Sequence, residues 1–329
     1  MHSEPTDGVV IDGLGRRLRN LRVSLTSACN YACVYCVPDG QRLKPNRQGL
    51  PLDRLLLAVE YLKVVNELHT LRITGGEPLI SPLFDGFMGA LSGLGFTDVS
   101  VTTNGQLLTR KLPVLLAAGV RRLNVSLDSL DGPAFRRIAR GGELGEVLAG
   151  IDQALAAGIR VKVNMVPMRG LNQEQVLLLL EYCLERGIEL RYIELMRMGH
   201  LARDSEAFQK QFIGMEELLV TVSTRYGFER APSAVDATAQ RFAIPGRGCF
   251  GIIANESAPF CGQCSRARLT STGWLHGCLS SSRSHYLGDL LELPREEALE
   301  RIRELSAQAL LDKGRRFSGD VMVMKVIGD

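Results

Sequence analysis

The stretch "LRVSLTSACNYACVYC", residues 21–36, joins a short run of alternating apolar and polar residues to three cysteines, Cys29, Cys33 and Cys36. The alternation over residues 21–25 is typical of a β-strand with one buried face. The cysteines follow at once with the spacing C-x-x-x-C-x-x-C, and an odd number of thiols does not close into disulfide pairs. The stretch therefore predicts a strand that leads directly into a metal-binding loop.

Five further strand candidates follow, at residues 70–74, 99–103, 122–127, 160–166 and 190–195. Longer segments with helical spacing separate them, such as 51–68 and 144–158, and Gly158 closes the second in the manner of a helix C-cap. This succession of six βα units predicts a parallel sheet with right-handed crossovers. The sheet is then either open and doubly wound or curved into a full or partial barrel.

In either fold, ligands bind where the carboxyl ends of the strands gather. The first four strands end in residues that are unusual for plain connections: "TSACNYACVYC", "GGEP", "TNG" and "DS". We therefore expect the functional site at this edge of the sheet. After residue 225 the alternation stops, and a Gly-, Ser- and Pro-rich stretch precedes one amphipathic helix at 294–314. The sequence thus predicts a barrel-like domain over 1–225 and a second domain over 226–329.

The bulk composition argues against several classes of protein. The chain has 329 residues, 45% of them hydrophobic, and a formal net charge of +3. No long run of like charges appears, so we expect no binding to nucleic acid. The cluster Arg16, Arg17, Arg19 and Arg22 is interpreted on charge alone as a solvated face. No segment has the length of a membrane span or the pattern of a secretory signal, and we therefore expect a cytoplasmic protein without membrane contact.

Six of the eight cysteines fall into two triplets, and the second triplet consists of Cys261, Cys264 and Cys278. Three thiolates hold either a zinc ion, which needs a fourth ligand, or an iron–sulfur cubane, whose fourth iron then stays open to a substrate or cofactor. No His or Cys between residues 37 and 68 completes the first set, whereas His276 is a candidate zinc ligand for the second. The remaining Cys183 and Cys249 are interpreted as structural.

The first triplet, with Tyr35 before its last cysteine, resembles the signature of the radical S-adenosylmethionine (SAM) enzymes. The resemblance implies a 4Fe-4S cluster whose open iron chelates the methionine end of SAM, and reductive cleavage of SAM to a 5′-deoxyadenosyl radical. Such a radical attacks unactivated C–H bonds, so it implies a site that excludes water. "TGGEP" at 74–78 is similar to the family's loop that meets the methionine amino group.

The second triplet narrows the resemblance. C-x-x-C, thirteen residues and C, joined to "RARL", is similar to the C-terminal cluster motif of the GTP 3′,8-cyclase (MoaA) family of molybdenum cofactor biosynthesis. "LRITGGEPL", "TTNG", "RLNVSLDSLD" and "RYIELM" match the same family in order along the chain. The resemblance implies an incomplete (β/α)₆ TIM-like barrel, closed by a C-terminal α+β domain that carries a second 4Fe-4S cluster. It also implies the radical conversion of GTP to 3′,8-cyclo-7,8-dihydro-GTP.

The resemblance also implies cofactors and partners. Two 4Fe-4S clusters and SAM are the cofactors, and GTP is the substrate. A flavodoxin or ferredoxin would donate electrons, and a cyclic pyranopterin monophosphate synthase would take the product. A homodimer is compatible with the family.

Carried over motif by motif, the resemblance implies three sets of site residues. Cluster ligands are expected at Cys29, Cys33, Cys36, Cys261, Cys264 and Cys278. SAM contacts are expected at Tyr35, Gly75, Gly76, Glu77, Ser126 and Met196. GTP contacts are expected at Arg22, Arg72, Thr102, Lys162, Arg191, Arg266 and Arg268. Since a triphosphate carries about four negative charges, basic side chains with few acidic neighbours suit its binding.

Three positions depart from the family pattern. Asp329 stands where the family ends in a second glycine, Thr70 where a phosphate-binding lysine is common, and Ser265 where asparagine is frequent. All three concern the substrate side. They keep open the alternative of a related radical SAM enzyme that acts on a different nucleotide or on a peptide. A non-enzymatic iron–sulfur or zinc protein is the second alternative.

Overall fold

The computed structural model describes residues 9–37, 44, 48–234 and 236–317. Strands and helices alternate in the predicted order over the first two thirds of the chain. The strands β1 to β6 cover Asn20–Ser24, Thr70–Thr74, Asp98–Thr103, Arg122–Ser126, Arg160–Met165 and Glu189–Ile193. The helices α1 to α9 cover Leu52–Asn66, Phe84–Ala90, Leu108–Ala117, Gly132–Ala139, Leu144–Ala156, Gln175–Glu185, His200–Arg203, Ser205–Gln211 and Met215–Ser223.

Shorter strands and one long helix follow residue 225. The strands β7 to β12 cover Glu229–Ala231, Gln240–Ile244, Gly248–Ile253, Arg266–Leu269, Trp274–His276 and His285–Tyr286, and α10 covers Arg295–Leu311. Short 3-10 turns lie at Pro78–Ile80, Leu91–Leu94, Cys261–Gln263 and Gly288–Glu292.

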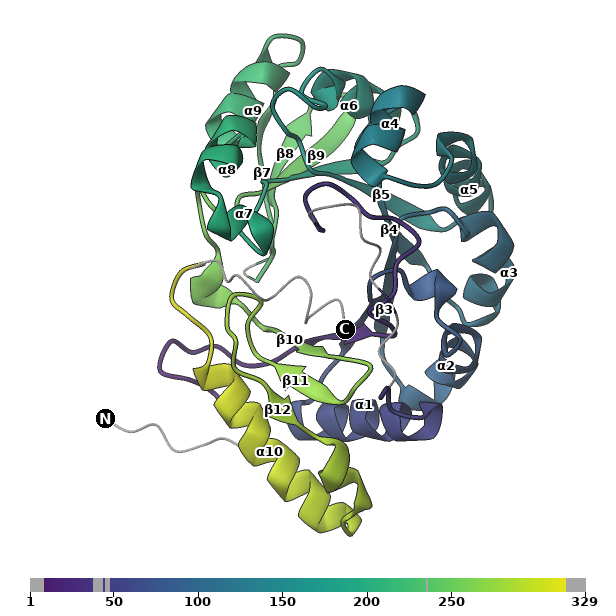
Figure 1. The fold of residues 1–329 in the computed structure, drawn as a ribbon, viewed down its shortest axis with the longest axis vertical. Helices are drawn as coiled ribbons and strands as arrows, with labels where there is room; N and C mark the ends of the chain where they lie inside the picture. Colours follow the sequence, from purple (N-terminus) through teal and green to yellow (C-terminus); the bar gives the residue numbers. More distant parts are fainter. Residues whose placement is uncertain (1–8, 38–43, 45–47, 235, 318–329) are drawn as a thin grey trace.

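All these strands belong to one sheet, with the order β12-β11-β10-β1-β2-β3-β4-β5-β6-β9-β8-β7. The strands β1 to β6 are parallel, and β10 and β9 pair in parallel with β1 and β6. Figure 1 shows the sheet curving through much of a circle, with α1 to α6 on its outer side. The predicted partial barrel is confirmed. The segment after residue 225 extends it at both edges, and the division at that residue stays a prediction.

The apolar core lies between the outer face of the sheet and the helices. Along β1, Leu21 and Val23 are buried against the helices, while Arg22 points to the opposite face. The same alternation occurs in β2, where Leu71 and Ile73 are fully buried. Because the apolar residues of each strand take the helix side, the polar residues are left on the concave inner face.

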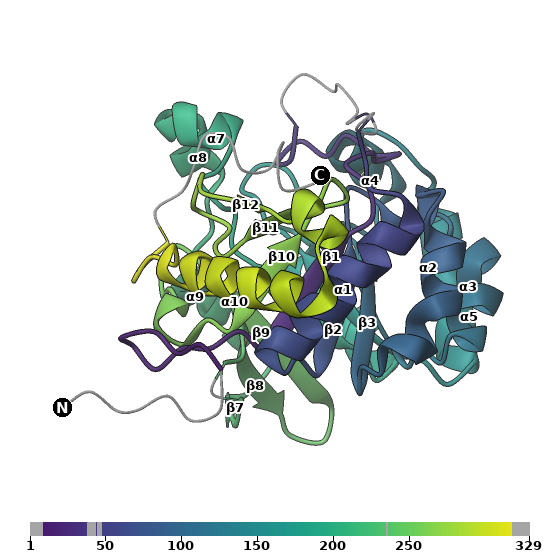
Figure 2. The same ribbon diagram turned by 90° about the horizontal axis from the view of Figure 1, so that it is seen from below.

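Helix α10 packs along α1, far from it in sequence, as Figure 2 shows. A buried hydrogen bond from Asn66 Nδ2 to Ser306 Oγ, 3.1 Å long, joins the two helices. Gly158 ends α5 as expected: its φ is +77°, and its amide donates to the carbonyl of Leu155 at 2.9 Å. In the described part of the chain, no helix combines the length and the apolar character needed to cross a bilayer.

Candidate active site

The loop after β1 carries the first cysteine triplet and is held rigidly by its backbone. The amide of Cys36 donates to the carbonyl of Cys33 at 2.9 Å, which closes a tight turn between the two thiols. The amide of Val34 donates to the carbonyl of Ile138 at 3.0 Å and so fastens the loop to α4. Tyr31 is buried edge-to-face against the ring of Phe135. The fold thus fixes the cysteine loop at the carboxyl end of β1, as expected.

The chemistry of these three thiols fits a polynuclear metal centre. In the described part of the chain, none of the three forms a disulfide, and all are half-buried. Burial, together with the neighbouring Cys29, raises the pKa of Cys36 to about 11. Burial also raises the pKa of Cys33 well above its ordinary value, with added repulsion from Asp128, Cys36 and Cys29. Crowded thiolates therefore need cationic compensation here, and iron ions supply it.

A mononuclear zinc site and an iron–sulfur cubane require different arrangements of their donor side chains. In the described residues, no group of three or more His, Cys, Asp or Glu side chains is arranged to hold a metal ion. A single zinc ion needs its donors within about 2.3 Å of one point, whereas a cubane binds each thiolate through a different iron, which leaves the sulfur atoms farther apart. His276, the candidate fourth ligand, has both ring nitrogens buried without a hydrogen-bond partner in the described part of the chain.

The glycines of "GGEP" approach the cysteine loop through close backbone contacts. Gly75 has a φ of +152°, which favours glycine, and a Cβ on Gly76 would lie 2.3 Å from the carbonyl oxygen of Ala28. The amide of Gly76 donates to the carbonyl of Thr26 at 2.7 Å, and that of Glu77 to the carbonyl of Ala28 at 2.8 Å. The two glycines are therefore required for the fit between β2 and the segment that leads into Cys29.

The Glu77 side chain acts inside the protein. It is 1% exposed, and it accepts hydrogen bonds from Leu79 N at 3.0 Å, Thr103 Oγ1 at 2.7 Å and Asn104 N at 2.7 Å. These contacts join "GGEP" to "TNG" at the end of β3. Asn104 in turn donates to Asn30 Oδ1 at 2.8 Å, in the cysteine loop. Burial raises the pKa of Glu77 to about 7, although the three hydrogen bonds oppose the shift. Glu77 therefore positions the loops around the first triplet.

Three of the expected SAM contacts line a single cavity of about 170 Å³: Tyr35, Ser126 and Met196. The cavity lies at the carboxyl ends of β4, β5 and β6, and Asp128, Asn164 and Glu194 complete its polar lining. Tyr35 donates to Asp128 Oδ2 at 3.0 Å, and Asn164 Oδ1 is buried without a partner in the described residues. Burial raises the pKa of Asp128 to about 6. An unpartnered acceptor and two carboxylate residues therefore line a space that is otherwise largely apolar.

The second triplet sits at the opposite end of the strands. Cys264 precedes β10, which runs parallel to β1, so its thiol lies near the amino end of this strand pair, whereas Cys29 follows the carboxyl end of β1. Cys278 follows β11, which is antiparallel to β10, and so returns to the same end as Cys264. Burial raises the pKa of Cys264, but the charges of Lys313 and Arg266 outweigh this effect and lower that pKa to about 7. This thiol is thus poised to bind metal as a thiolate.

Basic side chains lie between the two triplets on the inner face. In the sheet register, Arg22 is directly beside Arg72 on one side and Arg268 on the other. Burial, together with the charges of Arg268, Arg266 and Arg72, lowers the pKa of Arg22 to about 9. Arg22 has no hydrogen-bond or ion-pair partner in the described part of the chain. Like charges held together in a partly desolvated site indicate a place for an anion.

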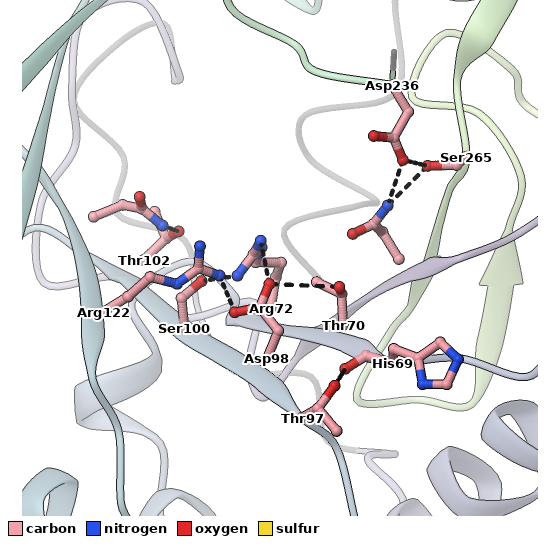
Figure 3. Close-up of polar contacts among 12 residues, drawn as sticks. His69, Thr70, Arg72, Thr97, Asp98, Ser100, Thr102, Arg122, Asp236 and Ser265 are labelled. Atoms are coloured by element: carbon pink, nitrogen blue, oxygen red, sulfur yellow. Dashed lines mark hydrogen bonds and ion pairs between the residues drawn. The ribbon is translucent and has the colours of Figure 1, made fainter. Parts of the chain in front are cut away.

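The expectation of few acidic neighbours is wrong for two of the basic residues. Arg72 donates to Asp98 Oδ2 at 3.1 Å, and Arg122 binds the other oxygen of the same carboxylate (Figure 3). Lys162 donates to Glu189 Oε1 at 2.7 Å. These pairs could not be expected from local sequence. Asp98 and Glu189 open strands that neighbour those of Arg72 and Lys162, about one βα unit away along the chain.

Arg191 and Arg266 contact polar and aromatic groups, although the charge of Glu189 also acts on Arg191. Arg191 donates to Asn124 Oδ1, and the amide of that Asn124 side chain donates to Thr102 Oγ1 at 3.2 Å. Burial lowers the pKa of Arg191 to about 10. The guanidinium group of Arg266 lies 4.7 Å from the centre of the Phe260 ring. The charges of Arg191 and Arg266 therefore remain available to an anion on the inner face of the sheet.

Two of the three departures from the family pattern are visible in Figure 3. Thr70 is paired with Asp98 across β2 and β3, and its hydroxyl contacts that carboxylate at 3.5 Å. Ser265 donates to Asp236 Oδ2 at 2.6 Å and accepts from Asn20 Nδ2 at 2.7 Å. Asp329 lies outside the described residues. Both visible departures therefore bring a carboxylate close to the expected substrate side.

Several functional residues escaped the sequence analysis. Arg16, interpreted as part of a solvated face, is 6% exposed, and its guanidinium donates to the carbonyl of Cys261 at 3.1 Å. That interpretation is wrong for Arg16 because its partners come from the far end of the chain. Asp128 was noted in the sequence only as part of "DS" after the fourth strand, without an assigned role. Cys183 lies in the core as expected, whereas Cys249 accepts from Arg241 at 3.1 Å beside Glu189.

Comparisons with known proteins agree with this arrangement. Residues 23–183 match the Radical SAM superfamily, and residues 188–318 match Molybdenum Cofactor Synthesis C. A GTP 3′,8-cyclase of Synechocystis sp. is 36% identical over 91% of this chain and 90% of that protein. GTP 3′,8-cyclase 1 of Pseudomonas aeruginosa is 36% identical over 96% of this chain and 97% of that protein. Among solved structures, Streptococcus suis SuiB bound to S-adenosylmethionine has a TM-score of 0.63 over 83% of this chain and 64% of that chain, at 15% identity, which shows a shared fold.

Proposed function

This chain belongs to the GTP 3′,8-cyclase family of radical SAM enzymes, and we propose on that premise that it converts GTP to 3′,8-cyclo-7,8-dihydro-GTP in molybdenum cofactor biosynthesis. One observation carries the proposal. Arg268, Arg22 and Arg72 stand side by side across β10, β1 and β2, at a level of the sheet between the two cysteine triplets. A negatively charged substrate held there has one triplet toward each of its ends.

Cys29, Cys33 and Cys36 would hold the first 4Fe-4S cluster, and Cys261, Cys264 and Cys278 the second. When bound, the first cluster and SAM would supply the radical chemistry that the cyclisation of GTP at its ribose 3′ carbon requires. The second triplet, at the other end of the strands, provides a place for the base. The separation of the triplets along β1 and β10 thus defines the direction in which the substrate lies.

The chain's own residues orient the cofactor and exclude water. Tyr35, Ser126 and Met196 line the cavity beside the first triplet, and Asn164 offers a buried acceptor to it. Glu77 locks the loops at the ends of β2 and β3 into one unit. A rigid and largely apolar wall is suited to a reactive carbon radical because it keeps the radical away from solvent and close to its target.

The basic side chains would bind the triphosphate. Binding an anion between Arg22, Arg266 and Arg268 relieves the mutual repulsion that lowers the pKa of Arg22. Planar guanidinium groups also match phosphate oxygens geometrically, and their hydrogen bonds to a charged acceptor are stronger than neutral ones. Arg72 and Lys162 bring less net charge to the site because Asp98 and Glu189 compensate them.

Anaerobic turnover tests this proposal. Reconstituted protein with a reductant, SAM and GTP should give 5′-deoxyadenosine and a cyclised GTP in equal amounts, and should hold about eight irons per chain. Cys261→Ala should abolish cyclisation and keep slow SAM cleavage, whereas Cys183→Ala, a matched control in the core, should keep both activities. Deoxyadenosine formed at the same slow rate with and without GTP would count against GTP as the substrate.

A different nucleotide is the second candidate substrate. The carboxylates of Asp98, Glu189 and Asp236 near the expected substrate side favour a ligand with fewer negative charges than GTP. A screen of nucleoside mono-, di- and triphosphates for stimulated SAM cleavage separates the two candidates. Stimulation by GTP above all others would exclude the second.

The partners are proposed on the family resemblance. A one-electron carrier of low potential such as flavodoxin or ferredoxin would reduce the first cluster, and a cyclic pyranopterin monophosphate synthase would consume the product, in the cytoplasm. Reduction by purified flavodoxin in place of a chemical reductant tests the first partner, and a coupled assay tests the second. Sedimentation analysis tests the expected homodimer.

A further inference from the structure

Lys313, just beyond the end of α10, has its ammonium group buried among the residues of the second triplet. The residue is 5% exposed, and its Nζ donates to Cys264 Sγ at 3.4 Å. The same nitrogen donates to the carbonyls of Arg266 and Gly277. Arg266 lies two positions after Cys264, and Gly277 directly precedes Cys278. One ammonium group therefore bridges the chain segments that contain Cys264 and Cys278.

Arg16 connects the same region to the third cysteine. Its Nη1 donates to the carbonyl of Cys261 at 3.1 Å and to that of Gly314 at 2.9 Å, and its Nη2 donates to the carbonyl of Lys313 at 2.9 Å. The Nε of Arg16 also donates to Asp12 Oδ2 at 2.7 Å, which fixes the orientation of the guanidinium group. The end of α10, the N-terminal segment and all three cysteine segments thus form one hydrogen-bonded unit centred on Lys313 and Arg16.

The packing of α10 leaves no room for this unit to shift. A Cβ placed on Gly277 would lie 1.6 Å from the carbonyl oxygen of Ala309, so the strand segment before Cys278 lies directly against the helix backbone. Residues Lys313 and Ala309 are about one helical turn apart. The packing of α10 therefore fixes the position of the Lys313 ammonium group relative to the segments of Cys264 and Cys278.

We propose that Lys313 is a positioning and redox-tuning residue of the second triplet. Its ammonium group holds the segments of Cys264 and Cys278 together and donates an N–H···S hydrogen bond to Cys264. With a cluster bound, a buried positive charge and a hydrogen bond to a ligand sulfur stabilise the reduced, more negative state, and so raise the reduction potential. This inference rests on the proposed function only in so far as the second triplet holds an iron–sulfur cluster.

The experiment compares reconstituted Lys313→Met and Lys313→Arg with wild type. Lys210→Met is the matched control, since Lys210 is exposed and pairs with Glu206 on the surface of α8. For each protein, we would measure iron per chain, the rate of iron loss to a chelator, and the midpoint potential of each cluster by EPR-monitored titration. GTP-independent formation of 5′-deoxyadenosine reports on the first cluster separately.

In Lys313→Met, we expect the second cluster to titrate at a lower potential and to lose iron to the chelator at least about tenfold faster. Its first cluster and GTP-independent SAM cleavage should match wild type, and Lys313→Arg should recover most of the potential. An unchanged second-cluster potential with unchanged iron loss in Lys313→Met would overturn the role of Lys313. Equal damage to both clusters would also overturn it, because it would show only general unfolding. A wild-type protein with about four irons would instead refute the proposed second cluster itself.

Discussion

Asp98 should weaken the binding of GTP, and its replacement by asparagine should therefore tighten that binding. The Asp98 carboxylate bridges Arg72 and Arg122 at the amino end of β3. Asparagine keeps a carbonyl oxygen in the same place, so the arginines retain an acceptor while the negative charge is removed. The substitution thus separates the charge of Asp98 from its positioning effect.

The size of the effect follows from Coulomb's law. A carboxylate about 6 Å from a phosphate raises the energy of the complex by about 3 kcal/mol at an effective dielectric constant of about 20. The Asp98 side chain is 36% exposed and shares its charge with two guanidinium groups, so screening reduces this to about 1 kcal/mol. One kilocalorie per mole corresponds to a roughly fivefold change in affinity.

Steady-state kinetics under anaerobic conditions measure this effect. In Asp98→Asn, the KM for GTP should fall roughly fivefold while kcat changes less than about twofold, because uniform binding alone is altered. The gain in affinity should shrink at high salt and should be smaller for GMP than for GTP. Asp85→Asn is the control, since Asp85 pairs with Lys111 at the surface. A higher KM in Asp98→Asn would refute the charge argument and assign Asp98 to holding Arg72 in place.

Three further predictions concern the residues around the two triplets. Arg22→Gln should raise the KM for GTP at least about tenfold, because charge-assisted hydrogen bonds to phosphate are lost, whereas the exposed Arg303→Gln should change nothing in the same assay. Gly76→Ala places a Cβ 2.3 Å from the carbonyl oxygen of Ala28 and should therefore abolish SAM cleavage. Gly89→Ala, which has open space at its Cβ, should keep SAM cleavage. Full activity of Gly76→Ala would contradict the close fit. Because burial raises the pKa of Glu77 to about 7 from 4.5, its stabilising contribution is complete below pH 4.5 and is lost as the pH rises through 7. Denaturant unfolding of the cluster-free protein should show up to about 3 kcal/mol of this pH dependence, and Glu77→Gln should remove it; equal slopes in both proteins would contradict the assignment.

The strands of the barrel were predictable because each is a short apolar alternation bounded by a turn. The run at 70–74 forms β2 over the same residues, and 122–127 forms β4 with one residue less. The places of β9 and β10 were not predictable. Each pairs with a strand tens to hundreds of residues away, and nothing within four to six residues encodes a partner at that distance.

The site divides in the same way, according to whether a residue acts within its own motif or through a distant partner. The cysteine spacing and "GGEP" act locally, and their close contacts follow from neighbouring parallel strands. Lys313 was invisible for the opposite reason: a lysine near the chain end has no local pattern that marks it, and only the packing of α10 on β11 brings it to Cys264. Asp98 was missed although Arg72, its partner, was expected at the site. Sequence motifs identify the groups that bind ligands, but the balance of charge around these groups depends on residues that the tertiary fold supplies. That balance sets affinity and potential, so the substrate and the redox behaviour of such a site are decided by residues outside its motifs.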